Sequence, residues 1–399
     1  MKICMLAYAH YMTDARIKSY VQTLETAGHV VDVIALRSES EPSKEATVRG
    51  TIWRVMDKYQ GQSKALYACS YLVFFLKAFL LLGRRSVRNR YDVIHVHNMP
   101  NVLVFAAAIP KLLGAKVMLD VHDLMTVNYM AKFGASEGDF PVRTLKAEQR
   151  IAAMFADHLF CADHNQQDYL VEHCSVARDK ITVLMNLPNT KLFGPMVPKK
   201  QSESNSFRIV YHGTIAHRLG IDLILRAMEK VVAEIPAELW IYGAGDYLPE
   251  ALELSTELGL DGRVHFSRSF FPVERIREFV SVMDLGIIGN RRNLACDQFM
   301  LPVKLLEYVY LGVPVVAPRL RVIQRYFDES MIRFYEPENV EQMAQAIVYL
   351  YRNREDGAKQ ARAASSFYRN HSTDAQAERY LSLLEGKVGR VRAVQEQRA

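Results

Sequence analysis

The chain has 399 residues, a length that suits two domains better than a single hydrophobic core. Half of the residues are hydrophobic and 24% are charged, which excludes a disordered or collagen-like protein. Five cysteines are scattered without a C-x-x-C pair, which argues against a zinc ribbon and a secreted disulfide framework. We therefore expect a globular protein of the reducing cytoplasm, whose first residues form a buried strand and not a signal peptide.

Short apolar runs alternate with segments of helical length in the first half of the chain. The predicted strands are residues 2–7, 30–36, 93–97, 116–121 and 158–161. Strands separated by helices form parallel, doubly wound sheets. The pattern predicts an N-terminal Rossmann-like α/β domain at residues 1–185.

A stretch rich in Pro, Ser, Asn and Lys predicts a linker at residues 186–206. Strands are then predicted at 207–212, 238–242, 263–266, 285–288 and 313–317, which gives a second Rossmann-like domain at 207–370. Residues 371–399 are predicted to be a C-terminal helix, at 373–385, and a tail. Ligands bind beyond the carboxyl ends of parallel strands, so we expect the function in the loops of two domains that face a cleft.

The net charge of +6 is unevenly distributed, because residues 51–100 hold eight Lys and Arg against two Asp and Glu. Within this region, residues 65–83 carry one charge, Lys77, and are marginally long enough to span a membrane. The mid-segment charge and the strand at 93–97 argue against spanning. The segment either packs on its domain or docks on anionic lipid through its basic end, which holds Arg84, Arg85, Arg88 and Arg90.

Two glycine-containing loops of the second half suggest a phosphate site. In YHGTIAHRLGIDLILRAM, Arg218 lies beside a helix start, where a guanidinium and backbone amides suit a diphosphate. The alternative is an ordinary turn with a surface arginine. IYGAGDY resembles a truncated dinucleotide fingerprint, although a tight turn explains Gly243 and Gly245 equally well.

The densest motif is DQFMLPVKLLEYVYLGVPVVAP, in which Lys304 and Glu307 share one face of a helix that begins after a proline. Near a helix N-terminus, the lysine suits a phosphate, and the carboxylate suits a ribose diol. The alternative is a surface ion pair between residues i and i+3, worth well under about 1 kcal/mol.

These motifs resemble the retaining, nucleotide-sugar-dependent glycosyltransferases of family 4, which have the two-lobed GT-B fold. The resemblance spans nearly the whole chain and includes DARIKSYVQTLETAGHVVDVIAL, DVIHVHN, LDVHD and YHGTIAHRLGIDL. It is most specific at LPVKLLEYVYLGVPVVAP, which indicates an L-P-x-K-L-x-E-Y subgroup. The resemblance implies an α/β enzyme with two Rossmann-like domains.

In that family, the residue matching Glu307 binds the nucleotide ribose, basic residues of the loop containing Arg218 bind the diphosphate, and the histidine matching His122 faces the sugar. The resemblance implies His122, Arg218 and Lys304 as catalytic. The expected donor-binding residues are Asp14, Gly213, Thr214, Arg218, Gly243, Arg268, Asp297, Leu301, Lys304, Leu305 and Glu307. The expected acceptor-side residues are His97, Asn98, His122 and Asp123. No metal or other cofactor is expected.

The chain departs from the family pattern at two places. Many members have an E-x7-E pair, but Phe299 stands eight residues before Glu307, and Asp297 replaces the first carboxylate only if the loop shifts. The Gly-Gly turn that follows the first strand in the family is replaced by residues 10–14. Donor recognition is therefore expected to differ from that of the typical member.

Histidines end two predicted strands of the first domain. His95 and His97 alternate along one strand end, and His122 follows the next strand with Asp123 beside it. A zinc site is the competing interpretation, but no third ligand stands at metal spacing in the sequence. We expect His97 and His122 to face the acceptor side and His95 to be a structural histidine.

The sequence thus predicts a cytoplasmic, metal-independent hexosyltransferase, peripheral on the inner face of the membrane. It moves a sugar from a nucleotide donor, expected to be a UDP-sugar, to a glycan or lipid-linked acceptor in cell-surface polysaccharide synthesis. A nucleotide-sugar epimerase of the same fold and a non-catalytic nucleotide-sugar binder stay open. A nicotinamide oxidoreductase is disfavoured because the first sheet lacks the glycine fingerprint, and no nucleic-acid partner is expected.

Overall fold

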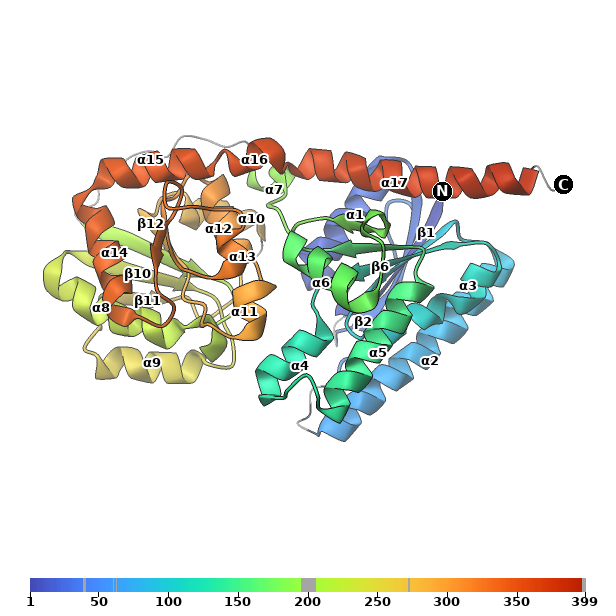
Figure 1. Ribbon diagram of the computed structural model, residues 1–399, viewed down its shortest axis with the longest axis horizontal. Coiled ribbons are helices and arrows are strands. Elements are labelled where there is room, and N and C mark those ends of the chain that lie inside the picture. The colour runs from blue at the N-terminus through green and yellow to red at the C-terminus, as the bar shows by residue number, and fades with distance from the viewer. Residues whose placement is uncertain (39–40, 60, 62, 195–205, 272, 397–399) are drawn as a thin grey trace. The chain divides into compact units, whose positions relative to one another are not determined.

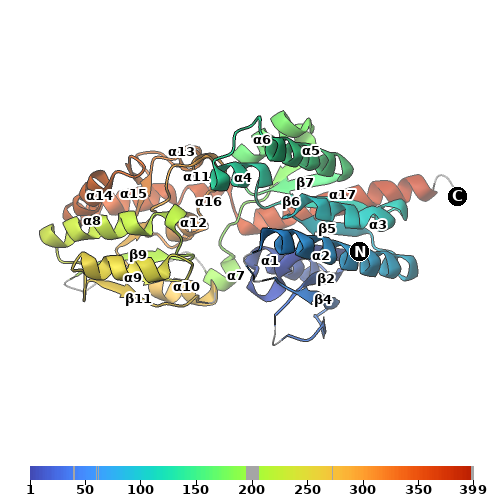
Figure 2. The same cartoon turned by 90° about the horizontal axis from the view of Figure 1, so that it is seen from below.

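The computed structural model describes residues 1–38, 41–59, 61, 63–194, 206–271 and 273–396, and it divides into two compact units. Unit 1 comprises Met1–Asn186 and Asp374–Ala399, and unit 2 comprises Leu187–Thr373. Each unit is an α/β fold around one sheet (Figures 1 and 2). Residues 195–205 of the predicted linker, 186–206, lie outside the described residues. The described part of this linker contains a short helix, α7 (Thr190–Phe193).

Unit 1 contains a sheet of eight strands in the order β3-β4-β2-β1-β5-β6-β7-β8. All neighbours pair in parallel except β3 and β4. The strands are β1 (Lys2–His10), β2 (Val30–Arg37), β3 (Lys44–Ala46), β4 (Thr51–Asp57), β5 (Val93–His97), β6 (Lys116–Val121), β7 (His158–Cys161) and β8 (Ile181–Val183). The central strands are almost wholly buried, as expected of parallel strands with helices on both faces.

The connections of unit 1 are helical. The α-helices are α1 (Ala15–Thr26), α2 (Lys64–Arg88), α3 (Ala108–Leu112), α4 (Met125–Phe133), α5 (Phe140–Phe155), α6 (His164–Cys174) and α17 (Thr373–Glu396). The 3₁₀ helices are η1 (Tyr11–Thr13), η2 (Asn101–Ala107) and η3 (Arg178–Lys180). Asp14 caps α1 by accepting a hydrogen bond from the Ile17 amide at 3.0 Å.

Unit 2 contains a six-stranded parallel sheet in the order β11-β10-β9-β12-β13-β14. Its strands are β9 (Phe207–His212), β10 (Ala237–Tyr242), β11 (Val264–Phe266), β12 (Leu285–Ile287), β13 (Val315–Pro318) and β14 (Arg333–Tyr335). Its helices are α7, η4 (His217–Leu219), α8 (Ile221–Glu234), α9 (Leu248–Glu257), α10 (Val273–Val280), α11 (Leu294–Gln298), α12 (Val303–Tyr310), α13 (Arg321–Gln324), α14 (Val340–Arg352), α15 (Arg354–Ala364) and α16 (Phe367–Asn370). Apolar faces of α8 and α14 close the core against the sheet.

The predicted doubly wound architecture is confirmed in both units, and β5, β6, β7 and β9 occupy the predicted residues. Four strands were not predicted: β3, β4, β8 and β14. Three of them are only three residues long, and β4 carries Arg54 and Asp57 within its run. Such strands lack the continuous apolar run by which the others are recognised.

Helix α2 contains the apolar stretch of the first domain. Residues Leu66–Arg88 are long and apolar enough to cross a membrane, but the same test is passed by core helices of other proteins. One face packs into unit 1 through Phe74, Ala78 and Leu82, which are at most 1% exposed. The opposite face exposes Leu72 and Leu80 at 57% and 67%. The helix is thus a packed part of unit 1 with a second apolar face exposed.

The C-terminal helix α17 belongs to unit 1 and is longer than the predicted 373–385. Tyr380 is 1% exposed and packs in the core with Tyr20 of α1, their ring centroids 4.8 Å apart. Its hydroxyl bonds Nδ1 of His95 at 2.8 Å. Figure 1 shows α17 running along unit 1 near the N-terminus. The last segment of the chain therefore completes the core that the first segment begins.

Substitution of Tyr380 should destabilise unit 1. We expect Tyr380→Ala to lower its unfolding free energy by about 3 to 5 kcal/mol, because a buried ring is removed. Tyr380→Phe should cost about 1 kcal/mol, because one hydrogen bond is lost. The two tryptophans, Trp53 in β4 and Trp240 in β10, allow the units to be followed separately.

Urea unfolding in a Trp240→Phe background, followed by Trp53 fluorescence, reports on unit 1 alone. The exposed neighbour Arg379 provides the matched control, and Arg379→Ala should leave the midpoint unchanged. Equal midpoints for the Tyr380 and Arg379 variants would show that α17 does not contribute to this core.

Candidate functional site

The loops that follow β9, β10 and β11 continue the pairing of their strands. The Gly213 amide donates to Tyr242 O at 2.9 Å, and the Gly243 amide donates to Ser267 Oγ at 3.0 Å. A Cβ on Gly243 would lie 1.9 Å from Gly213 O, and one on Gly245 would lie 2.0 Å from Ile215 O. Both glycines are therefore required by close backbone approach, which corrects the tight-turn interpretation.

Lys304, in the first turn of α12, crosses the Gly213 loop. A Cβ on Gly213 would lie 3.6 Å from Nζ of Lys304. Nζ also lies 3.6 Å from the ring centroid of Tyr211. The residue is partly exposed as a whole, yet Nζ is buried and has no hydrogen-bond partner among the described residues.

The charge of this ammonium is therefore poorly compensated. Burial lowers the pKa of Lys304 to about 7, an effect that Glu307 opposes and Arg218 reinforces. The i,i+3 ion pair considered from the sequence is not formed. Glu307 is 7% exposed and instead accepts a hydrogen bond from Nε2 of His212, the last residue of β9. The site thus contains a fixed carboxylate beside an unpaired cation.

Arg218 lies in η4, exposed, with Nη1 4.0 Å from Sδ of Met300. Asp297 is 8% exposed, and its Oδ1 accepts from the Arg321 amide at 3.2 Å, at the start of α13. Asp297 is therefore engaged with its own unit in this structure. Leu305 is fully buried, so its side chain supports α12 from the core.

The remaining predicted donor residues occupy the loops of the same sheet edge, apart from Asp14. Thr214 and Arg268 are exposed, after β9 and β11, and Arg268 has a φ of +56°. Leu301 precedes the proline that begins α12 and is half-buried. Asp14 lies in unit 1, where it lines a pocket. The structure thus brings together Gly213, Lys304, Glu307 and Arg218 within unit 2, and places Asp14 with the predicted acceptor residues.

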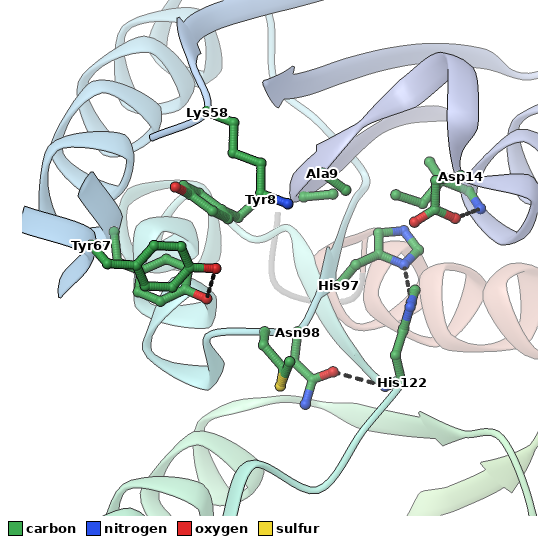
Figure 3. A pocket seen from close by; sticks show the side chains of 12 residues that line it. Tyr8, Ala9, Asp14, Lys58, Tyr67, His97, Asn98 and His122 are labelled. Atoms are coloured by element: carbon green, nitrogen blue, oxygen red, sulfur yellow. Dashed lines mark hydrogen bonds between the residues drawn. The ribbon is translucent and has the colours of Figure 1, made fainter. Parts of the chain in front are cut away.

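A second candidate site is a pocket of about 170 Å³ in unit 1 (Figure 3). It lies beyond the carboxyl ends of β1, β5 and β6. Its polar lining comprises Tyr8, Asp14, Lys58, Tyr67, Tyr71, His97, Asn98 and His122. Figure 3 shows the histidine pair on the side opposite Tyr67. His97, Asn98 and His122, which were predicted for the acceptor side, therefore line one pocket.

The histidines are held by a buried ion pair. Asp120 of β6 is fully buried and accepts from Nε and Nη2 of Arg16 at 2.8 and 2.7 Å. Burial alone would raise the pKa of Asp120, but the Arg16 guanidinium and the neighbouring His122 hold it well below its usual range. Oδ2 lies 3.4 Å from Nδ1 of His97 and from Nε2 of His122, and these two ring nitrogens are 3.0 Å apart.

Asn98 fixes the turn that carries His122. Its Oδ1 accepts from the amide of His122 at 2.8 Å, and its Nδ2 donates to Asp123 O at 2.7 Å. Asn98 is 6% exposed. The predicted acceptor residues Asn98 and Asp123 thus hold the β6–α4 turn in place in this structure; Asn98 and His122 line the pocket, and Asp123 is not among its lining residues.

A third potential metal ligand does exist, which corrects the sequence interpretation. His95, His97 and Asp120 bring ligand atoms within 4.8 Å of one another, because β5 and β6 pair with His97 opposite Asp120. The Arg16 fork, however, engages both oxygens of Asp120, so the carboxylate already has its counter-charge. His95 is structural, as expected, with the Tyr380 hydroxyl as its partner.

The sequence analysis missed Arg16, Asp120 and His212, which hold the predicted residues in place. Their signals were present but weak. Arg16 and Asp120 lie within two of the quoted motifs, and His212 immediately precedes Gly213. Their significance depends on pairings between distant segments, which one sequence does not display.

The buried ammonium of Lys304 should cost stability at neutral pH. Lysine has a pKa near 10.4 in the unfolded chain, so this chain binds more protons when unfolded between pH 7 and pH 10. Unit 2 should therefore gain stability as the pH rises from 7 to 9.5, and Lys304→Met should abolish this gain. At pH 7 the variant should be more stable, by on the order of 2 kcal/mol.

Urea unfolding followed by Trp240 in a Trp53→Phe background measures this effect. Lys230→Met, at an exposed lysine of α8, is the matched control and should retain the wild-type pH profile. Destabilisation by Lys304→Met at pH 7 would contradict the assignment of an uncompensated charge.

Two family models match the chain. Residues 15–191 match the model described as Glycosyltransferase Family 4, and residues 206–353 match the model described as Glycosyl transferases group 1. A curated relative, the chitobiosyldiphosphodolichol beta-mannosyltransferase of Debaryomyces hansenii, is 22% identical over 284 residues. That match covers 65% of this chain and 59% of the relative, so the chain spans less than two thirds of the relative's length.

Solved structures resemble the chain over nearly its full length. Sucrose-phosphate synthase from Thermosynechococcus elongatus has a TM-score of 0.76 at 15% identity, covering 97% of this chain and 99% of that one. Anabaena HepE in complex with UDP and glucose has a TM-score of 0.70 at 15% identity, covering 97% and 100%. A glycosyltransferase from Rickettsia africae has a TM-score of 0.68 at 13% identity, covering 97% and 98%. The solved structures show that the chain has the GT-B fold, and the two family models, which follow one another along the chain, show that both of its halves resemble glycosyltransferases.

Proposed function

We propose that this chain transfers a sugar from a nucleoside diphosphate sugar, expected to be a UDP-sugar, to a glycan or lipid-linked acceptor in cell-surface polysaccharide synthesis. The observation that carries the proposal is the buried Nζ of Lys304, which lies against Gly213 with no partner among the described residues. A desolvated cation is stabilised by a bound anion, and a diphosphate supplies one.

In this proposal, unit 2 binds the donor. Lys304 and Arg218 neutralise the charge that develops on the departing diphosphate, a preorganised electrostatic contribution. Glu307 accepts hydrogen bonds from the ribose hydroxyls, in an orientation fixed by His212. Because two side-chain cations supply the positive charge, the proposed reaction needs no metal.

We propose retention of configuration at the anomeric carbon. The acceptor hydroxyl attacks from the face on which the nucleotide leaves, the bond from the anomeric carbon to the phosphate oxygen breaks, and the new glycosidic bond forms on that face. The hydroxyl proton passes to the departing phosphate oxygen, through an oxocarbenium-like transition state. His122 faces the transferred sugar; its backbone amide donates to Oδ1 of Asn98, and its ring is hydrogen-bonded to His97.

Two similar proteins support the substrate classes. Anabaena HepE has been solved with UDP, with UDP and glucose, and with UDP-glucose, which favours a UDP-sugar here. The Debaryomyces relative is named for a diphosphodolichol-linked acceptor, which favours a lipid-linked acceptor.

We propose that the protein acts in the cytoplasm, peripherally bound to the inner face of the membrane. The exposed apolar face of α2 and the exposed Arg84, Arg88 and Arg90 at its end support this location. Arg85 does not contribute to such docking, because its guanidinium bonds Asp32 at 2.7 Å within unit 1.

Nucleotide binding is the first expectation to test. A thermal-shift screen with UDP, GDP, ADP, TDP, CMP and NADH should show a selective rise in melting temperature with one nucleoside diphosphate, expected to be UDP. Glu307→Ala should remove the shift, because the ribose contact is lost, whereas Glu341→Ala at an exposed site should keep it. A shift with NADH alone would overturn the transferase proposal.

Turnover and stereochemistry are the second expectation. Lys304→Ala should lower kcat by about 10²- to 10³-fold, as measured when one charge-stabilising group is removed. Lys230→Ala is the exposed control and should keep wild-type turnover. NMR of the first-formed product should show the donor's anomeric configuration.

Three outcomes would contradict the proposal. An inverted product would exclude the retaining mechanism. A rearranged free sugar formed without an acceptor would indicate an epimerase. Nucleotide-sugar binding without any turnover would indicate a non-catalytic binder.

A further inference from the structure

An apolar groove lies in unit 1 next to the polar pocket. It has a volume of about 490 Å³, within the size range of small-molecule sites. One wall is the face of α4 that presents Met125, Tyr129 and Phe133, residues spaced four apart. A second wall comes from α5, through Phe140 and Leu145. The groove is therefore built mainly from apolar and aromatic side chains.

The groove exposes large aromatic rings. Phe140 is 81% exposed and Phe133 is 46% exposed. The ring of Phe133 packs on Tyr129 with centroids 4.7 Å apart, so the α4 wall is ordered by its own contacts. Leaving such rings in water is unfavourable, and adjacent exposed apolar side chains are typical of binding surfaces.

The groove and the polar pocket share two walls. Tyr71 of α2 and Met99, after β5, line both. The Tyr71 hydroxyl donates to the Tyr67 hydroxyl at 3.3 Å on the pocket side. A ligand that occupies both sites therefore has a polar end beside His97 and His122 and an apolar end along α4.

The polar pocket and the groove each have a lysine in their lining, which suits a ligand that carries a phosphate. Lys58 lines the polar pocket, and Lys132 lines the groove with Nζ 5.7 Å from the Phe133 ring centroid. Of the two carboxylates at the pocket, Asp120 beneath it is paired with Arg16, and Asp14, which lines it, accepts a hydrogen bond from the Ile17 amide at the start of α1. A lipid phosphate carries the complementary charge together with a chain that fits the apolar lining.

We propose that this groove, between α4 and α5, binds the hydrocarbon chain of a phosphate-linked lipid acceptor whose sugar end lies in the adjoining polar pocket. The inference rests on the proposed function, because it identifies the acceptor of that reaction. It assigns Phe133 and Phe140 as chain-binding residues, and Tyr71 and Met99 as the boundary between the polar and apolar parts of the acceptor.

Calorimetric titration of the full-length protein with monomeric farnesyl phosphate, without any nucleotide, tests this site. We expect binding that the double variant Phe133→Ser/Phe140→Ser weakens by at least about tenfold. The matched control is Ile151→Ser/Met154→Ser, at residues of α5 that are 56% and 64% exposed and do not line the groove. This control should change the affinity less than about twofold. All four side chains are exposed enough for the variants to fold, which circular dichroism checks.

Competition experiments separate the chain from the head group. Farnesol should compete with farnesyl phosphate, because it carries the same chain, and inorganic diphosphate should compete weakly. Absence of binding to the wild-type protein, equal losses in the two double variants, or displacement by diphosphate alone would each overturn the proposal. The proposal would also be overturned if the Phe133→Ser/Phe140→Ser variant lost binding to anionic vesicles but kept its affinity for farnesyl phosphate. The groove residues would then contact the bilayer and not the acceptor chain.

The result is separable from the proposed function. UDP binding is measured independently, through unit 2 and the Glu307→Ala variant. UDP binding without farnesyl phosphate binding rejects only the groove. Farnesyl phosphate binding without any nucleotide binding rejects the transferase proposal and leaves the groove as a lipid site.

Discussion

Burying a charge is costly unless a partner compensates it, and this constraint organises both units. In unit 1, the buried Asp120 is neutralised by the Arg16 fork, which also donates to Leu184 O at 2.8 Å and thereby joins α1, β6 and the end of the last strand. Oδ2 of Asp120 also lies 3.4 Å from a ring nitrogen of each pocket histidine, His97 and His122. In unit 2, Glu307 is held by His212, and Lys304 is left without a partner among the described residues. The buried ammonium of Lys304 therefore marks a place in unit 2 where an anion can bind.

The candidate sites of the two units suit ligands of different chemistry. The site in unit 2 combines a cation, a carboxylate and glycine loops whose backbones touch, which suits a compact, highly charged ligand. The sites in unit 1 form a polar pocket joined to an apolar groove through Tyr71 and Met99. This second arrangement suits a ligand that is polar at one end and apolar at the other.

Much of the fold could be predicted from the sequence, because buried parallel strands form continuous apolar runs such as that of β1. The short edge strands could not, since β3 is wholly exposed and depends on pairing with β4. Lys304 and Glu307 were recognised from a local motif. Asp120 and His212 were not, because their importance arises from residues more than 90 positions away in sequence, Arg16 and Glu307. The groove residues of α4 and α5 carried no local signal that separates them from core positions.

The return of α17 to unit 1 also has a consequence for biosynthesis. The core around Tyr20 and His95 lacks Tyr380 and Leu384 until α17, which follows unit 2 in the chain, has been synthesised. At about 5 to 20 residues per second, the first half of the chain waits many seconds for its last helix. The core of the N-terminal half therefore stays open around Tyr20 and His95 while the residues of unit 2 are being synthesised.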